Sequence, residues 1–177
     1  MLWAATNSGK TEVAIAVTKV LDLPTLFLVK GKDLVQQTYE RYKTRLGGDE
    51  IGIITSSKWD VRKFTVASAD TLARRLMNKR PSDKARQRCQ DVKDLLHSID
   101  VVIIDEAHGA ASEGLWNVVR FCSASYRFGL SGTPFKRGDK QDLKLIALTG
   151  DIIYRVSNKE MIEDGVSVPT EIVLVDI

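Results

Sequence analysis

The sequence has 177 residues, of which 44% are hydrophobic and 28% charged, a profile typical of a single globular domain with one substantial core. Its net charge of +3 does not by itself indicate a nucleic-acid-binding protein. No apolar run is long enough to cross a membrane and the first residues lack the pattern of a secretory signal, so we expect a cytoplasmic protein without a membrane partner, in which Cys89 and Cys122 are reduced thiols.

Short apolar runs alternate with amphipathic stretches along the chain. The runs predict β-strands at 26–29, 51–54, 64–67, 101–104 and 126–130, and a last strand-like run covers 171–176. Helical spacing of apolar residues predicts helices at 13–21, 34–46, 86–98 and 115–122. This alternation favours an α/β fold with a parallel sheet and right-handed crossovers.

Residues 4–11 have the sequence A-A-T-N-S-G-K-T and match three of the four defining positions of a Walker A loop, with Ala4 in place of the first glycine. Almost no strand precedes this loop in the sequence. Backbone N–H groups of such a loop hold phosphates, while Lys10 would reach the β- and γ-phosphates and the Thr11 hydroxyl would bind magnesium. The predicted nucleotide-binding residues are Ala4, Ala5, Thr6, Asn7, Ser8, Gly9, Lys10 and Thr11.

An acidic pair, Asp105 and Glu106, directly follows the buried apolar run 101–104, which is the pattern of a Walker B site. Asp105 would hold magnesium, directly or through water, and Glu106 would orient and deprotonate the attacking water. The structural alternative is a helix N-terminal cap. The Walker A loop earlier in the chain favours the Walker B interpretation.

The stretch Ser131-Gly132-Thr133-Pro134 follows the predicted strand 126–130. Its residue types also fit a simple turn. Its position after the acidic strand indicates instead a hydroxyl-based sensor that links the state of the nucleotide to movement elsewhere.

Basic residues are concentrated between Arg74 and Lys93. This segment has eight Lys or Arg and two Asp, a net charge of +6 that leaves −3 for the rest of the chain. Such a patch could follow a phosphate backbone, and the alternative is a solvated helix face or exposed loop. Trp59, predicted to lie in a polar loop, either packs against a neighbouring helix, which we favour, or stacks on a base.

The three stretches, in this order, resemble motifs I, II and III of the superfamily 2 helicases and translocases, with motif II in the form D-E-A-H. Residues 29–37 and 66–72 resemble motifs Ia and Ib, so the resemblance spans nearly the whole chain. The stretch 127–137 is similar to motif III and its flanking residues in repair, restriction and phage-encoded DNA helicases. The pair D-E-A-H and S-G-T-P is the specific part of the match.

The resemblance implies a RecA-like P-loop NTPase domain with a mainly parallel central sheet and helices on both faces. It implies an ATP- and Mg²⁺-dependent motor that drives unwinding or branch migration of DNA, with RNA as the alternative partner. Lys10 and Glu106 would be catalytic, and His108 would couple the nucleotide site to Ser131 and Thr133. The residues implied near nucleic acid are Lys30, Gly31, Gln36, Ser68, Asp70 and Thr71.

Two positions depart from the family pattern. Asn7 stands where glycine is usual, but asparagine tolerates left-handed backbone angles, so we expect the loop to form. Gly31 stands where this subgroup often has arginine, which weakens the predicted motif Ia contact.

Family members have a segment before motif I that binds the adenine base, and a second RecA-like domain after motif III. We therefore expect residues 1–177 to be a single first motor lobe of a longer enzyme, located in the cytoplasm or on the nucleoid, or in the host cytoplasm if the protein is phage-encoded.

Two other functions compete with a motor. In an ATP-gated binding module, ATP sets only the affinity for DNA, RNA or a partner, and such a switch has no need of a base such as Glu106. The second competing function is a small-molecule P-loop kinase, and the D-E-A-H and S-G-T-P pair argues against it.

Overall fold

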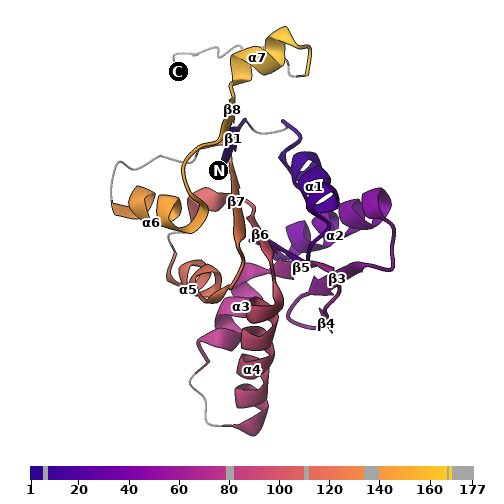
Figure 1. The fold of residues 1–177 in the computed structure, drawn as a ribbon, viewed down its shortest axis with the longest axis vertical. Coiled ribbons are helices and arrows are strands. Elements are labelled where there is room, and N and C mark those ends of the chain that lie inside the picture. The colour runs from indigo at the N-terminus through magenta and orange to yellow at the C-terminus, as the bar shows by residue number, and fades with distance from the viewer. Residues whose placement is uncertain (6–7, 79–81, 110–111, 134–139, 167, 169–177) are drawn as a thin grey trace, which may run out of the picture.

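In the computed structural model, a strongly twisted β-sheet has helices on both faces (Figure 1). The structure describes residues 1–5, 8–78, 82–109, 112–133, 140–166 and 168. Within these residues the sheet has eight strands in the order β4-β3-β5-β2-β6-β7-β1-β8. The strands are β1 (Leu2–Ala4), β2 (Thr25–Val29), β3 (Ile51–Ile54), β4 (Trp59–Asp60), β5 (Phe64–Ser68), β6 (Val101–Ile104), β7 (Tyr126–Ser131) and β8 (Tyr154–Val156).

Every neighbouring pair of strands is parallel except β3 and β4, which form an antiparallel hairpin. Crossovers between parallel strands require helices, and these cover the two faces of the sheet. The helices are α1 (Lys10–Leu21), α2 (Lys32–Leu46), α3 (Ala69–Leu76), α4 (Asp83–Ser98), α5 (Glu113–Phe121), α6 (Lys140–Thr149) and α7 (Asn158–Glu163), with a short 3₁₀ helix, η1 (Ala107–Gly109).

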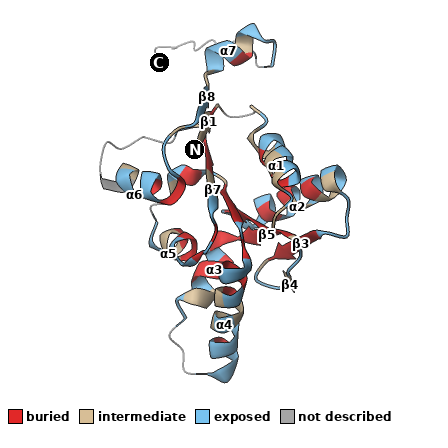
Figure 2. Ribbon diagram, in the orientation of Figure 1, coloured by how far each residue is buried: buried red, intermediate tan, exposed pale blue. Residues whose placement is uncertain are grey.

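The core consists of two apolar layers, one on each face of the sheet. Leu26 and Leu28 of β2 point into the layer beneath α3, α4, α5 and α6, whereas Phe27 and Val29 point into the layer beneath α1 and α2. This alternation follows the two-residue period of a strand, and burial on both faces explains why β2 is apolar after its first residue. Figure 2 shows the buried strands between the helices, whose outer surfaces are exposed.

All five internal strands and all four helices predicted from the sequence are confirmed, with bounds within three residues. The predicted run 171–176 lies outside the described residues. Short elements were missed: β1, β4, β8, α3, α6 and α7. The strand before the Walker A loop is short, as expected: β1 has three residues, and these pair with both β7 and β8.

Trp59 lies in β4, so its assignment to a loop was wrong, but the favoured packing role is confirmed. Its ring is partly buried against the core layer beneath α3 and α4. Both cysteines are free thiols, as predicted, and Cys122 is buried. Across the described residues, no helix combines the length and apolar character needed to pass through a bilayer.

The β3–β4 hairpin closes tightly over Gly52. A Cβ atom at this position would lie 2.5 Å from the Asp60 carbonyl oxygen and 2.7 Å from the Arg62 nitrogen, both backbone atoms. We expect Gly52→Ala to lower the free energy of unfolding by about 1–3 kcal/mol, because backbone atoms cannot move aside as a side chain can. Urea unfolding measures this. The matched control is Gly48→Ala, whose added Cβ would meet only Lys43 Cε at 3.5 Å; equal stability of the two variants would contradict the prediction.

Candidate active site

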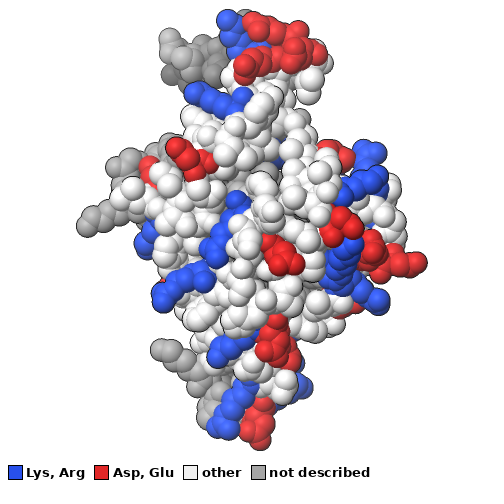
Figure 3. Space-filling model, viewed as in Figure 1, with Lys and Arg blue, Asp and Glu red and all other residues white. Residues whose placement is uncertain are grey.

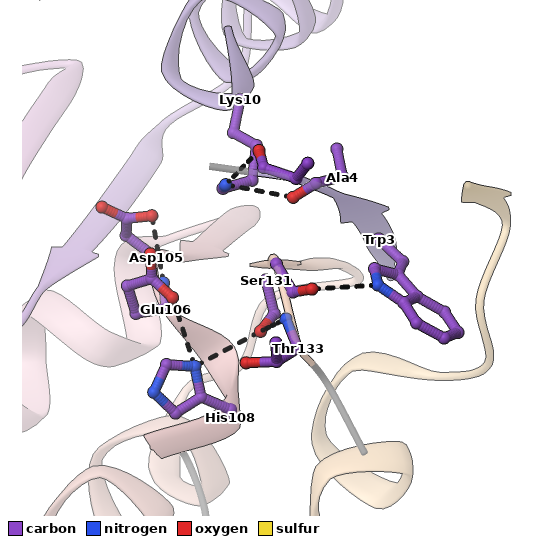
Figure 4. A network of polar contacts seen from close by, with 10 residues as sticks. Trp3, Ala4, Lys10, Asp105, Glu106, His108, Ser131 and Thr133 are labelled. Atoms are coloured by element: carbon purple, nitrogen blue, oxygen red, sulfur yellow. Dashed lines mark hydrogen bonds and ion pairs between the residues drawn. The ribbon is translucent and has the colours of Figure 1, made fainter. Parts of the chain in front are cut away.

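Three of the predicted motifs meet at one edge of the sheet because of the strand order β6-β7-β1. All three strands are parallel, so their carboxyl ends share an edge, where ligands of open α/β sheets bind. Asp105 follows β6, Ser131 ends β7, and the Walker A loop follows β1. Ser131 therefore lies between the other two motifs (Figure 4).

The Walker A loop connects β1 to the N-terminus of α1. Gly9, the N-cap of α1, has a left-handed backbone (φ +75°), and no side chain caps the helix. The helix N-terminus, with its partial positive charge and N–H donors, is therefore a suitable place for a phosphate group. Thr11 lies in the first turn of α1, whereas Thr6 and Asn7 lie outside the described residues.

Lys10 and Ser8 provide polar groups of this loop that could bind an anion. Lys10 Nζ donates hydrogen bonds to the carbonyl oxygens of Ala4 (3.1 Å) and Ala5 (2.9 Å), so its ammonium group is turned back over the loop. Ser8 Oγ is buried and, within the described residues, has no hydrogen-bond partner. A buried polar atom without a partner is costly, and a phosphate oxygen would provide one. The loop thus fits a nucleotide phosphate.

The acidic pair lies just beyond β6. Asp105 N–H donates to Leu28 O (2.9 Å), which ties the residue to the neighbouring strand, and Glu106 N–H donates to Asp105 Oδ1 (3.0 Å). Burial raises the pKa of the Asp105 carboxyl and the Glu106 charge adds to this, against the opposing effects of the Glu106 N–H, Lys10 and His108. A cation at Asp105 would favour the ionised form.

Glu106 has a left-handed backbone (φ +46°), one of two such non-glycine residues in the described part of the chain. A strained conformation of this kind costs free energy and is common at functional sites. The Glu106 side chain is 47% exposed, so its carboxylate is accessible to water. No group of three or more His, Cys, Asp or Glu in the described ranges could hold a metal, so Mg²⁺ would depend on Asp105, Thr11 and oxygens of the nucleotide and water.

His108 connects the acidic pair to β7. Its Nδ1 lies 3.2 Å from Glu106 Oε2 and 3.3 Å from the Oγ of the fully buried Ser131, and Thr133 N–H donates to the same Oγ (3.2 Å). The structure thus brings together His108, Ser131 and Thr133, the three predicted coupling residues (Figure 4).

Close packing supports this contact between η1 and β7. A Cβ atom on Gly129 would lie 3.0 Å from Ala107 Cβ and 2.9 Å from Thr149 Cγ2, so glycine is needed for β7 to approach η1 and α6.

Trp3 is a site residue that the sequence did not reveal. Its Nε1–H donates to Gly132 O (3.0 Å), and the Arg155 guanidinium lies 4.0 Å from the ring centroid. Trp3 therefore holds the loop after β7 from the β1 side, opposite His108. No pattern in the sequence indicates this contact, because it joins residues 129 positions apart.

The predicted nucleic-acid-facing residues fall into two neighbouring groups, since Val29 at the end of β2 is paired with Ser68 at the end of β5. Lys30, Gly31 and Gln36 are exposed, and Gly31 is the N-cap of α2 with φ +98°. Gln36 Nε2 donates to Glu40 Oε1 (2.7 Å).

The second group has a structural role as well. Ser68 is the N-cap of α3, and its Oγ accepts a hydrogen bond from Thr71 N–H (3.2 Å). Both Ser68 and Thr71 are buried, whereas Asp70 is exposed. Of these three side chains, that of Asp70 is the most accessible to a nucleic-acid strand.

Comparison with known proteins agrees with this arrangement. A model of the family described as type III restriction enzyme, res subunit, matches residues 1–136. The DNA 3′-5′ translocase XPB2 of Sulfurisphaera tokodaii is 32% identical over 156 residues, which cover 88% of this chain and 31% of the translocase.

Two solved structures share the fold. The Hef helicase domain of Pyrococcus furiosus has a TM-score of 0.68 and 23% identity, over 89% of this chain and 34% of that one. The UvsW helicase of bacteriophage T4 has a TM-score of 0.61 and 14% identity, over 87% and 53%. The predicted RecA-like fold is therefore confirmed, and the chain spans about a third of the length of the translocase.

Burial of Asp105 leads to a prediction about stability. Since the folded-state pKa of Asp105 is raised from 3.8, its protonated form is favoured in the folded protein, and this stabilisation is lost as the pH rises through the folded-state pKa. We therefore expect Asp105→Asn to increase the free energy of unfolding at pH 7, with the gain shrinking as the pH falls toward 4. Urea unfolding at both pH values tests this, with the exposed Asp100→Asn as control. Lower stability of Asp105→Asn at pH 7 would refute it.

Proposed function

Because the chain belongs to the family of type III restriction enzyme res subunits and has the superfamily 2 helicase motor fold, we propose that it is the ATP-binding motor domain of a DNA helicase or translocase. It hydrolyses ATP to ADP and phosphate and so drives unwinding or branch migration. The observation that carries this proposal is the strand order β6-β7-β1, which aligns Glu106, Ser131 and Lys10 along one edge.

In this proposal the Walker A loop positions the triphosphate. Lys10 leaves the carbonyl oxygens of Ala4 and Ala5 and turns toward the β- and γ-phosphates, while Ser8 Oγ and the N-terminus of α1 supply further donors. Thr11 and Asp105 would hold Mg²⁺, which when bound would supply charge neutralisation at the phosphate oxygens.

Glu106 acts as the general base. It takes a proton from water as the water oxygen attacks the γ-phosphorus and the bond to the β,γ-bridging oxygen breaks, with that oxygen leaving on ADP. His108 contacts both Glu106 and Ser131, so a change at the carboxylate alters the support of the loop after β7. Trp3 restrains the other side of that loop.

We propose that a second RecA-like domain of the full-length protein completes the site. The chain spans about a third of the DNA translocase to which it is similar, which leaves room for such a domain. In superfamily 2 enzymes this domain supplies an arginine finger, and arginine fingers in phosphoryl transfer are worth about 10³–10⁵ in kcat. We therefore expect the 177-residue chain alone to bind ATP but to turn it over slowly. We place the enzyme in the cytoplasm, where Cys89 and Cys122 stay reduced.

A motor is favoured over an ATP-gated binding module by the position of Glu106, whose exposed carboxylate adjoins Asp105 and contacts the coupling histidine. A module that only binds ATP has no use for a base held in a strained backbone. DNA is favoured over RNA because the 32% identical relative is named a DNA translocase.

Lys10→Ala tests the nucleotide site. The variant loses the ammonium group that contacts the phosphates, and a charge-assisted hydrogen bond contributes about 1.5–3 kcal/mol, so we expect ATP binding to fall by at least about tenfold and toward the limit of detection. Equilibrium titration with a fluorescent ATP analogue measures this. The control is Lys19→Ala, an exposed lysine in the last turn of the same helix. Unchanged affinity of Lys10→Ala would remove Lys10 from the site.

Glu106→Gln separates binding from hydrolysis. The amide keeps the shape of the side chain but cannot accept the proton, so we expect unchanged ATP binding and a loss of about 10²–10⁴ in kcat. Steady-state hydrolysis by the full-length protein, with single-stranded, duplex and forked DNA and with RNA, provides the measurement. Retained turnover in the variant would exclude Glu106 as the base. Absence of nucleic-acid stimulation in the wild type would exclude the motor.

A further inference from the structure

A polar cavity of about 180 Å³ lies beside the β3–β4 hairpin, away from the nucleotide site. Its walls come from the turn of this hairpin, from α3 and the residues after it, and from the second turn of α4. The lining residues are Ser56, Thr71, Arg74, Arg75, Asn78 and Arg88.

The lining of this cavity has three guanidinium groups and no carboxylate. Within the described residues, no carboxylate lies in ion-pair distance of Arg74, Arg75 or Arg88. Like charges gathered without an ion-paired carboxylate repel one another, so a bound anion would stabilise the cluster.

The rest of the basic segment differs from the cavity. On the outer surface of α4, Arg86 pairs with Asp83 (3.4 Å), and Gln87 Nε2 donates to Asp91 Oδ1 (2.8 Å). Figure 3 shows basic and acidic side chains mixed over the lower part of the molecule, where α4 lies. Arg86 therefore has an ion-pair partner on the surface of α4, whereas the three arginines of the cavity have none within the described residues.

Two of the arginines are held in place. The Arg75 guanidinium lies 4.4 Å from the centroid of the Trp59 ring, and Arg74 Nε donates to Asp70 O (3.2 Å). Burial lowers the pKa of Arg75 and the nearby Arg88 charge lowers it further, against the effect of Asp91. A guanidinium fixed on an aromatic face still presents N–H donors at its edge, which can bind phosphate in a bidentate manner.

The cavity lies next to the residues implied to face nucleic acid. Ile54 at the end of β3 is paired with Ala67 of β5, so Ser56 and the start of α3 share the edge at which Asp70 and Lys30 lie. Cys89 Sγ donates to Leu76 O (3.5 Å) and so fixes α4, which carries Arg88, against the end of α3.

We propose that this cavity binds a backbone phosphate of the DNA strand on which the motor acts, with Arg74, Arg75 and Arg88 as the cationic ligands and the exposed Ser56 as a further donor. This inference rests on the proposed function. Contacts from guanidinium groups to phosphate position a strand without reading its bases, so the contribution is independent of sequence.

Arg88→Gln in the full-length protein is the direct test. In counterion-release terms each phosphate contact contributes about 0.9 to the slope of log Kobs against log salt, which corresponds to about eightfold in affinity at 0.1 M salt relative to 1 M. We therefore expect Arg88→Gln to weaken binding about eightfold and to lower the slope by about 1, equally for two unrelated DNA sequences. Fluorescence anisotropy of labelled single-stranded oligonucleotides between 50 and 200 mM salt provides the readout.

Arg86→Gln is the matched control, because Arg86 lies two residues away on the same exposed helix and pairs with Asp83 outside the cavity. Ser56→Asp adds a negative charge to the opposite wall of the cavity without changing α4. We expect it to weaken DNA binding at least as much as Arg88→Gln. ATP binding of each variant should equal that of the wild type, which verifies folding.

The outcomes separate the two proposals. If the wild type binds DNA and Arg88→Gln behaves like Arg86→Gln, the phosphate site is refuted while the motor function stands. A loss confined to one DNA sequence would indicate a base contact and would also refute it. If the wild type binds no nucleic acid, the proposed function itself fails.

Discussion

The parallel pairing of β7 between β6 and β1 is the constraint on which the site depends. The β1–β7 pairing joins segments more than a hundred residues apart, and the two pairings together place the ends of three strands at one edge. The loop after β7 is then held from both sides, by His108 through Ser131 and by Trp3 through Gly132. These two contacts connect the acidic pair on one side, and β1 on the other, to the loop after β7.

Several groups at this edge oppose stability. The Asp105 carboxyl is buried, Glu106 has a left-handed backbone, and Ser8 Oγ is buried without a partner within the described residues. Each has a free-energy cost in the protein without ligand; a cation would offset the cost at Asp105 and a phosphate oxygen the cost at Ser8. Elsewhere the two core layers are continuous and apolar, so these three costs lie together at the edge where we propose that the nucleotide binds.

The two proposed ligands, the nucleotide and a backbone phosphate of DNA, would bind at separate places along this edge. In the order β3-β5-β2-β6-β7-β1, the arginine cavity adjoins β3 and the phosphate loop follows β1. Five strand spacings of about 4.8 Å separate these strands, or roughly 24 Å. The predicted nucleic-acid-facing residues after β2 and β5 lie between the two. A DNA strand bound along this edge would therefore not overlap the nucleotide, although it would contact neighbouring elements of the sheet.

The sequence by itself determined the class of fold, the five internal strands and the identities of Lys10, Asp105, Glu106 and His108, because these follow from local periodicity and from motifs contained in a few consecutive residues. Only the tertiary structure decided which motifs are neighbours, that three residues suffice for β1, and that Trp3 supports the loop after β7. It also decided which arginines of the basic segment line a common cavity. The physical reason is that strand order and helix packing depend on contacts between distant residues, and such contacts leave no local pattern.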